Sequence, residues 1–310
     1  MDKCTYRSGV GDSFDFCAIQ KISIMKQILL SILLILVFNP IFGQKHFDIP
    51  ENKVVGRFIE TLSKNLKDFD SQDLRVSEDS LSIRVWKTHE VFTISQNNAS
   101  TSSDCKFHTT NKELVFKSFH FSESVSRSIM DSLLVAGIWN LKDENYRGID
   151  GSFVFVEIST KSKYKVVSYW SPNSERSNDC KTVVQILKMI DNTIDSKKLR
   201  NEFLNSLPSG SYRWGMASIR IDKFLNKDIA KTDFYKEAEY KIKQELEITN
   251  KTNHWEYPLI LIDNEYAKIS DLNKYNDKQI SKFEVLKTDN NVIAIYGTNG
   301  NNGVVIIETK

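Results

Sequence analysis

The sequence contains little proline, glycine and cysteine: 5, 12 and 4 residues, respectively, among 310. Scarce proline and glycine are not the composition of a low-complexity chain. The sequence also has no internal repeat, which argues against a repeat architecture. The composition is that of an ordered globular protein, and the length predicts about two domains at roughly 150 residues each.

An excess of charge of one sign is also missing. Charged residues make up 26% of the sequence, but they nearly cancel, and the formal net charge is only +2. Such a balance gives no long-range field that would favour nucleic acid or an anionic membrane surface as a partner. We therefore expect neither of these partners.

The motifs of several well-known catalytic sites are absent. The sequence has no GxSxG and no HExxH motif. Ser103 to Lys106 and Ser162 to Lys165 match the Ser-x-x-Lys spacing of penicillin-recognising enzymes, but the companion motifs Ser-Asp-Asn and Lys-Thr-Gly do not occur. Chance matches are expected in a chain rich in serine and lysine. We therefore predict no catalytic residue and no cofactor from motifs.

Three residues could be considered as zinc ligands: Cys105, His108 and His120. An offset of three residues in a strand points Cys105 and His108 to opposite faces, and no second Cys/His pair completes a tetrahedral site. We therefore predict no metal site.

An acidic cluster and a set of aromatic residues are weaker candidates for a site. Asp143, Glu144 and Asp150 could bind a cation or act as acid and base, although a solvated turn is the more ordinary role. Five aromatic residues could line a carbohydrate or peptide groove, but we expect most of them in the core or on a hairpin face. They are Trp139, Tyr169, Trp170, Tyr212 and Trp214.

The N-terminal part has a pattern typical of export. Met25 and Lys26 precede an apolar block from Ile28 to Phe38, and Gly43 provides a small residue before Gln44. A short basic start, an apolar core of about 7 to 15 residues and a final small residue are the parts of a signal peptide. A membrane-spanning helix would need about 20 mostly apolar residues.

The sequence therefore predicts an upstream extension at residues 1–24, a signal peptide at residues 25–43 and a mature chain from about Gln44. No cysteine follows the apolar block, so no lipoprotein processing site is predicted. We expect an exported protein, periplasmic or associated with the outer membrane, with no membrane-spanning segment in its mature part.

Two cysteines, Cys105 and Cys180, belong to this mature chain. In an oxidising compartment they could form one disulfide. The alternative is two small buried thiols, because free cysteine packs like an apolar residue.

Hydrophobic periodicity predicts alternating helices and strands between residues 50 and 248. Predicted helices run from Pro50 to about Leu66, from Ser122 to Gly137, from Asn178 or Asp179 to Ile194, from Leu199 to Leu207 and from Thr232 to about Glu247. Predicted strands cover Leu81–Trp86, Val91–Ser95, parts of Cys105–Phe121, a hairpin of Phe153–Ile158 with Tyr164–Trp170, and Tyr212–Ile221. The mixture predicts an α+β fold.

The most distinctive stretch is residues 290–310. Gly297, Gly300 and Gly303 recur every three residues and separate an apolar segment from the run Val304–Ile307. Four consecutive branched aliphatic residues predict a strand buried on both faces. A nucleotide-binding loop would need a helix after the glycines, whereas here a strand follows, so we interpret the glycine loop as structural.

Together with PLILID (residues 258–263) and ISKFEVLK (residues 280–287), this stretch resembles the second half of the plug domain of TonB-dependent outer-membrane receptors. The motif residues are Tyr296 and Gly297 of an AIYG sequence, Gly300 in the loop, and Gly303 before the aliphatic run. The resemblance covers about the last 55 residues.

In that family the plug lies inside a 22-stranded barrel and gates the passage of substrate. This chain has Asn299 where the family usually places an arginine, and Asn264 where it usually places a glycine. These departures, and the lack of a barrel sequence after the plug-like stretch, argue against transport by this chain alone.

We therefore predict an α+β domain of unknown function at residues 44–248, a linker at 249–257 and a plug-like module at 258–310. The leading hypothesis is a non-enzymatic exported envelope protein whose module contacts another envelope protein or the first domain. One alternative is a secreted enzyme with its site in residues 139–170 and a structural module. Another is a remnant of a TonB-dependent receptor.

Overall fold

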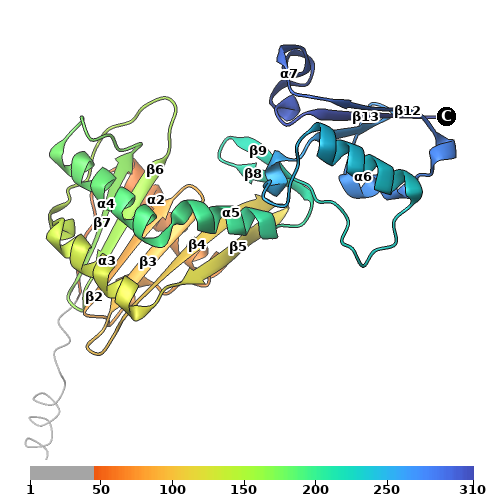
Figure 1. The fold of residues 1–310 in the computed structure, drawn as a ribbon. Helices are drawn as coiled ribbons and strands as arrows, with labels where there is room; N and C mark the ends of the chain where they lie inside the picture. Colours follow the sequence, from red (N-terminus) through yellow and green to blue (C-terminus); the bar gives the residue numbers. More distant parts are fainter. Residues whose placement is uncertain (1–44) are drawn as a thin grey trace, which may run out of the picture. The chain divides into compact units, whose positions relative to one another are not determined.

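Two β-sheets organise residues 45–310, which are the residues that the computed structural model describes. Helices pack on the faces of both sheets, so the predicted α+β class is confirmed (Figure 1). The predicted upstream extension and signal peptide lie outside the described residues. Within the described part of the chain, no helix is long and apolar enough to cross a bilayer.

The large sheet contains nine strands in the order β1-β7-β6-β2-β3-β4-β8-β9, with β5 paired to β4. All neighbours are antiparallel except β1 and β7. Its strands are β1 (His46–Asp48), β2 (Leu81–Lys87), β3 (Glu90–Gln96), β4 (Thr101–Asn111), β5 (Glu113–His120), β6 (Phe153–Ser159), β7 (Lys163–Trp170), β8 (Gly210–Trp214) and β9 (Ala217–Ile221).

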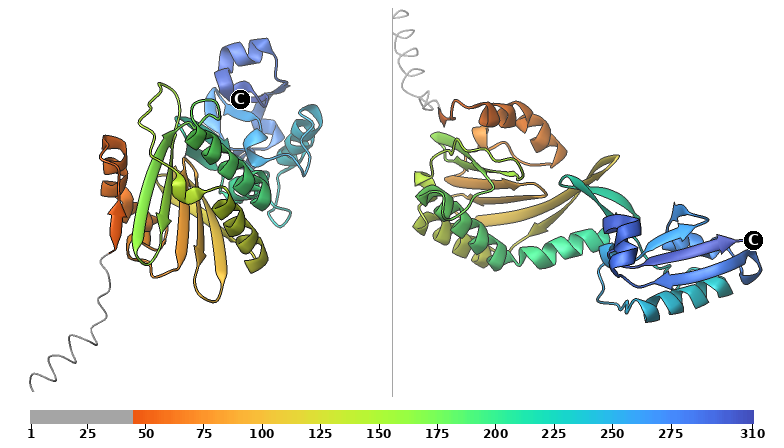
Figure 2. Two further views of the ribbon diagram at one scale, coloured as in Figure 1. Left: turned by 90° about the vertical axis from the view of Figure 1, so that its left-hand side faces the viewer. Right: turned by 90° about the horizontal axis from the view of Figure 1, so that it is seen from above.

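Three helices cover one face of this sheet, which we call the helical face (Figure 2). They are α3 (Glu123–Val135), α4 (Asn178–Ile194) and α5 (Ser196–Ser206), and the short helix η2 (Ile138–Asn140) follows α3. Apolar residues of all three helices form one buried cluster with alternate residues of the central strands. This cluster is the main core of the protein.

The opposite face, which we call the open face, is only partly covered. Helix α2 (Lys53–Asp68) and the short helix η1 (Leu74–Val76) pack there against strands β2 and β7 (Figure 2). Asn52 caps α2 by accepting hydrogen bonds from the amides of Val54 and Val55. Val55, Phe58, Leu62 and Leu66 are buried, as the helical spacing predicted.

The small sheet has the order β11-β10-β13-β12. Its strands are β10 (Leu259–Ile262), β11 (Glu265–Ala267), β12 (Ile280–Leu286) and β13 (Val304–Thr309), and the helical elements nearby are α6 (Asp233–Glu245), η3 (His254–Glu256), η4 (Ile269–Lys274), η5 (Asp277–Gln279), α7 (Asn290–Tyr296) and η6 (Gly297–Gly300). Strand β13 lies between β10 and β12, and Val304, Val305 and Ile307 are fully buried. The predicted buried strand is confirmed.

Several boundaries differ from the sequence prediction. Ser177, rather than a residue within the helix, caps α4. Residues 212–221 form a hairpin of two strands, since Gly215 adopts a positive φ of 65° between them. Strand β11 was not predicted; it pairs with β10 because Asp263 and Asn264 reverse the chain in left-handed conformations.

The segment predicted to be a linker, residues 249–257, contains the short helix η3. Helix α6, which precedes it, buries Phe234, Tyr235, Ala238 and Ile242 against the small sheet. Within the linker, the His254 amide donates to Asn205 Oδ1 at 2.9 Å. The segment is thus held by specific contacts, and α6 packs with the small sheet.

Candidate binding face of the large sheet

The two faces of the large sheet differ in chemistry because side chains alternate along each strand. On β2, Ile83 and Val85 enter the main core, whereas Arg84 and Trp86 point to the open face. The same alternation continues on β3, where Ile94 is in the core and Thr93 contacts Arg84.

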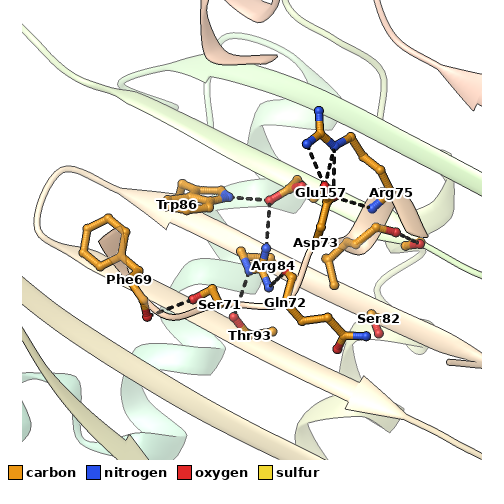
Figure 3. Close-up of polar contacts among 12 residues, drawn as sticks. Phe69, Ser71, Gln72, Asp73, Arg75, Ser82, Arg84, Trp86, Thr93 and Glu157 are labelled. Carbon is orange, nitrogen blue, oxygen red and sulfur yellow. Dashed lines mark hydrogen bonds and ion pairs between the residues drawn. The ribbon is translucent and has the colours of Figure 1, made fainter. Parts of the chain in front are cut away.

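Arg84 is the centre of a buried charged network on the open face (Figure 3). Its side chain is 1% exposed, and its Nη1 lies 3.6 Å from Glu157 Oε2, whose side chain is fully buried. Arg84 Nε donates to Thr93 Oγ1 at 3.1 Å, and Nη2 donates to the Gln72 carbonyl at 2.8 Å. The guanidinium therefore joins strands β2, β3 and β6 to the segment after α2.

Glu157 also accepts two hydrogen bonds from aromatic residues. Trp86 Nε1 donates to Oε2 at 2.5 Å, and the Tyr164 hydroxyl donates to Oε1 at 2.8 Å. Burial, together with the Glu157 carboxylate, raises the pKa of the Tyr164 hydroxyl above its ordinary value. The hydroxyl consequently remains a donor, and the buried carboxylate keeps its partners.

A second cation, Lys106, fixes the segment Phe69–Gln72, which we call the divider. Its Nζ donates to the carbonyl of Phe69 at 2.6 Å, to the carbonyl of Asp70 at 2.8 Å and to Ser71 Oγ at 3.0 Å. Asp70 has a φ of 46°, so the chain turns sharply here. The divider lines two separate hollows of the open face.

The first hollow is a polar cavity of about 240 Å³ beside β2, β3 and β4. Arg84 Nη1 and Asp104 Oδ2 are buried there without a hydrogen-bond partner among the described residues. Burial raises the pKa of the Asp104 carboxyl, although the charge of Lys106 opposes this effect. The cavity is lined by Asp70, Ser71, Gln72, Asp79, Arg84, Thr93, Ser95, Asn97, Ser102, Asp104 and Lys106.

The second hollow is an aromatic groove of about 360 Å³ between α2 and strands β2, β4, β5 and β6. Phe58 and Phe155 stack with ring centroids 4.2 Å apart, and Phe153 and Phe155 are half-buried. The groove is lined by Phe58, Asn65, Asp68, Phe69, Trp86, Lys87, Thr88, His108, Thr110, Leu114, Phe153 and Phe155. An apolar floor with a polar rim is the usual composition of a binding groove.

His108 lies in the groove with its ring 4.7 Å from that of Phe69. Burial and the neighbouring His89 lower the pKa of His108 to about 4. His89 stacks on Trp214 at 4.0 Å, and its Nε2 accepts a hydrogen bond from the Gly215 amide. Both rings are therefore uncharged at neutral pH.

A charged cleft of about 640 Å³ lies at the end of the helical face. Lys87 Nζ bridges Glu90 Oε1 at 2.6 Å and Asp191 Oδ1 at 2.7 Å, and Ser196 Oγ donates to Glu90 Oε2. Lys87 thus pairs with both carboxylates, and these contacts tie β2 and β3 to α4 and α5. We interpret the cleft as a structural junction.

Of the two possibilities that the sequence left open for Cys105 and Cys180, the structure shows two free, buried thiols and no disulfide. Cys105 lies on β4 in the core, where burial raises its pKa. Cys180 lies in the first turn of α4 and donates to Glu144 Oε1 at 3.0 Å. Each thiol thus packs in a different part of the core, as in the alternative that the sequence left open.

The acidic cluster has structural contacts. Asp143 Oδ1 accepts hydrogen bonds from the amide and hydroxyl of Ser168 at 2.7 and 2.8 Å. Glu144 forms an ion pair with Arg176 at 2.8 Å, and Asp150 is exposed. Asp143 and Glu144 thereby attach their loop to β7 and to the start of α4, and neither lines any hollow named above.

The aromatic residues singled out from the sequence lie apart from the groove. Tyr169 and Tyr212 are buried in the main core, and Trp139 and Trp214 pack against it. Trp170 packs on Phe153 with ring centroids 4.7 Å apart, so it supports the groove from the side.

The glycine motif forms the end of α7 and the loop before β13. Tyr296 is the last residue of α7, and Gly297 and Gly303 adopt positive φ angles of 61° and 84°. Gly300 lies against Val292, so a side chain at this position would collide with the helix. These glycines therefore shape the turn into β13. None of them lines the polar cavity or the aromatic groove.

Comparisons with known proteins give no relative from which a role could be transferred. No protein-family model, no curated protein and no solved structure matches the chain.

Sequence reasoning missed the residues of the open face. Arg84 and Glu157 lie on strands that are far apart in the sequence and adjacent in the sheet. The strand Phe153–Ser159 could have pointed to this face, because its apolar residues occupy both of its sides. Such a strand is covered by apolar groups on both faces of its sheet.

Proposed function

We propose that this chain is an exported, non-enzymatic interaction protein of the cell envelope, which binds a segment of a partner protein in the aromatic groove of the open face. The observation that carries this proposal is the groove itself: aromatic rings held in place by mutual stacking, with a rim of polar side chains. Large apolar side chains of a partner would bury their surface on such a floor.

The ring contacts favour a protein partner over a sugar. Sugar recognition uses a flat aromatic face that is open to solvent, whereas Trp86 is 7% exposed and its Nε1 is tied to Glu157. The accessible rings are those of Phe153 and Phe155, which offer apolar edges without hydrogen-bonding groups.

The contacts of Asp143 and Glu144 support the binding hypothesis over a secreted enzyme with its site in residues 139–170. Both carboxylates already hold Ser168 and Arg176. A general acid or base needs a carboxyl group within reach of a substrate.

The C-terminal module adds a second contact surface in this proposal. Helix α7 exposes Ile293 and Ile295, which are 39% and 72% exposed. Exposed branched side chains beside a small core gain stability from a neighbouring surface. Because the module resembles the plug of outer-membrane receptors, we propose that its partner is an outer-membrane protein. The same partner is expected if the chain is a remnant of such a receptor.

Export is part of the same proposal. It is supported by the signal-peptide pattern at residues 25–43. Intact-mass analysis of protein recovered from the envelope should give a chain that begins near Gln44. Full-length protein retained in the cytoplasm would contradict export.

The groove is tested by a charge placed on its exposed rim. Thr110→Glu puts a carboxylate at the groove without disturbing the core, because Thr110 is exposed. Thr193→Glu, at an exposed threonine near the end of α4 and outside the groove, is the matched control. We expect Thr110→Glu, but not the control, to lose partners that cross-link to the wild-type protein in envelope extracts.

The module is tested in the same assay with Ile295→Glu, and Ile149→Glu in an exposed loop is its control. Identical partners for the wild type, Thr110→Glu and Ile295→Glu would contradict the proposed function. Loss with one variant alone would assign the contact to that surface.

A further inference from the structure

A cavity of about 540 Å³ beside helix α6 is rich in lysine and has no role in the function proposed above. We call it the lysine cavity. It is lined by Lys223, Phe224, Leu225, Asn226, Lys227, Lys231, Glu239, Lys243, Ile248, Thr249, Asn250, His254 and Tyr257. The residues come from the segment before α6, from α6 itself and from the stretch that the sequence predicted to be a linker.

The charges around this cavity do not cancel. Four lysines against one glutamate leave a formal charge of +3. Lys231 and Lys243 both form ion pairs with Glu239, which neutralises one of them. Burial alone would raise the pKa of the Glu239 carboxyl, but the hydrogen bonds from the two lysines lower it, so the carboxylate stays charged.

Lys223 and Lys227 form no ion pair with any described residue of the chain. The nearby carboxylate of Asp222 is occupied by the backbone amides of Lys223 and Ile269. Burial lowers the pKa of the Lys223 ammonium, and no carboxylate offsets this effect. The two ammonium groups therefore lack a counter-charge.

The remaining wall is aromatic. The rings of Phe224 and Tyr257 lie 5.3 Å apart, and Lys243 Nζ lies 4.5 Å from the Phe224 centroid. His254 Nδ1 is 2.9 Å from the Asn205 carbonyl, so this nitrogen carries the proton of the neutral ring. Two aromatic faces next to ammonium groups can hold a flat ring and the anion attached to it.

We propose that the lysine cavity binds a small phosphate ester that carries a flat ring, such as a nucleoside monophosphate. Lysine ammonium groups bind phosphate as point charges, and Lys223 and Lys227 provide two such groups at the cavity. The volume lies within the range of about 300 to 1,000 Å³ that is usual for small-molecule sites.

The experiment is calorimetric titration of the purified mature chain at about 0.15 M salt, where weak surface attraction is screened. The probes are adenosine monophosphate, inorganic phosphate and citrate, with vesicles of phosphatidylglycerol as a source of lipid phosphate. We expect adenosine monophosphate to bind more tightly than inorganic phosphate, because the ring adds aromatic contact, and citrate to bind more weakly than adenosine monophosphate.

Variants assign the binding to this cavity. The double variant Lys223→Gln/Lys227→Gln should weaken binding of adenosine monophosphate by about tenfold or more, since two charge-assisted contacts are removed. Phe224→Leu should reduce the preference for adenosine monophosphate over inorganic phosphate. Lys278→Gln, at an exposed lysine outside the cavity, should change neither value.

Three results would overturn the proposal: no binding of adenosine monophosphate, equal weakening in the Lys278→Gln control, or binding to vesicles alone. Thermal unfolding of each variant checks that it folds. Loss of partner contacts through the aromatic groove would not affect this titration, so the two proposals can fail separately.

Discussion

The two faces of the large sheet are built from the same strands and serve different purposes. On the helical face, Ile83 and Ile94 pack under α3 and α4 in a continuous apolar core. On the open face, their sequence neighbours Arg84 and Thr93 line a polar cavity. The difference teaches that one side of the sheet carries the main apolar core, whereas the other side combines a smaller apolar cluster with buried charges and hollows.

The largest expected effect on stability concerns the buried ion pair of the open face and tests whether that pair stabilises the fold. Arg84→Ala leaves the fully buried Glu157 without its counter-charge. We expect a loss of about 4 kcal/mol in the free energy of unfolding, measured by urea denaturation.

The companion variant Arg84→Met/Glu157→Gln removes both charges, while the amide at position 157 keeps an acceptor for Trp86 Nε1 and a polar partner for the Tyr164 hydroxyl. We expect its stability to lie within about 1 kcal/mol of the wild type, since the attraction in a buried ion pair roughly offsets its desolvation cost. A double variant as unstable as Arg84→Ala would show that the charged pair itself stabilises the sheet.

The next largest effect compares adjacent residues of β3 that point to opposite faces. Ile94→Ala should lower the free energy of unfolding by about 3 kcal/mol, because it opens a cavity in the main core. Ser95→Ala removes a hydrogen bond to Ser82 Oγ and should cost about 1 kcal/mol. If denaturant unfolding gives equal losses of free energy for the two variants, the helical face does not contribute more to stability at this strand than the open face does.

A smaller effect concerns pH and the aromatic groove. The folded pKa of His108, about 4, is below the ordinary value of 6.5, so its contribution to stability is complete above pH 6.5 and falls as the pH drops toward 4. We expect a loss of about 1 to 2 kcal/mol between pH 7 and pH 5 that His108→Phe removes.

The matched control is His120→Gln, at an exposed histidine of the same face. This variant should keep the pH dependence of the wild type. Urea unfolding at pH 7 and pH 5 measures the loss for each protein. If the wild type, His108→Phe and the control all lose the same free energy of unfolding, the pH dependence comes from another group.

The smallest effect is expected for Phe116→Thr. Phe116 is 36% exposed at the side of the open face, so its removal should change the free energy of unfolding by only about 0.5 kcal/mol. Phe107→Ala on the helical face removes a buried ring from β4 and should cost about 3 to 5 kcal/mol. Similar melting curves for the two variants would contradict the comparison.

Much of the fold could be predicted because local patterns agree with the final structure. Helix α3 begins after Ser122, whose hydroxyl accepts from the Val125 amide, and its apolar residues recur at helical spacing. Strands β2, β3, β6 and β7 follow the predicted runs. The partner of α6 could not be predicted, since Phe234 and Ala238 would pack equally well on either sheet.

The candidate site could not be predicted for a different reason. No motif in the sequence points to Arg84, Glu157 and Lys106 as a group, and only strand pairing brings them to one face. Single charged residues in strands are ordinarily solvent-exposed, so the pattern predicts no buried network. The free thiols could not be predicted either, because spacing in sequence does not give the distance between two cysteines.

The divider is held by a cation that belongs to the chain. Lys106 Nζ has three oxygen neighbours at 2.6 to 3.0 Å, from Phe69, Asp70 and Ser71, much as a bound metal ion gathers the oxygens of a loop. Because this cation is a side chain of the protein, it cannot be extracted by a chelator or exchanged for calcium. The wall between the polar cavity and the aromatic groove thus keeps its position regardless of the ions in the surrounding medium.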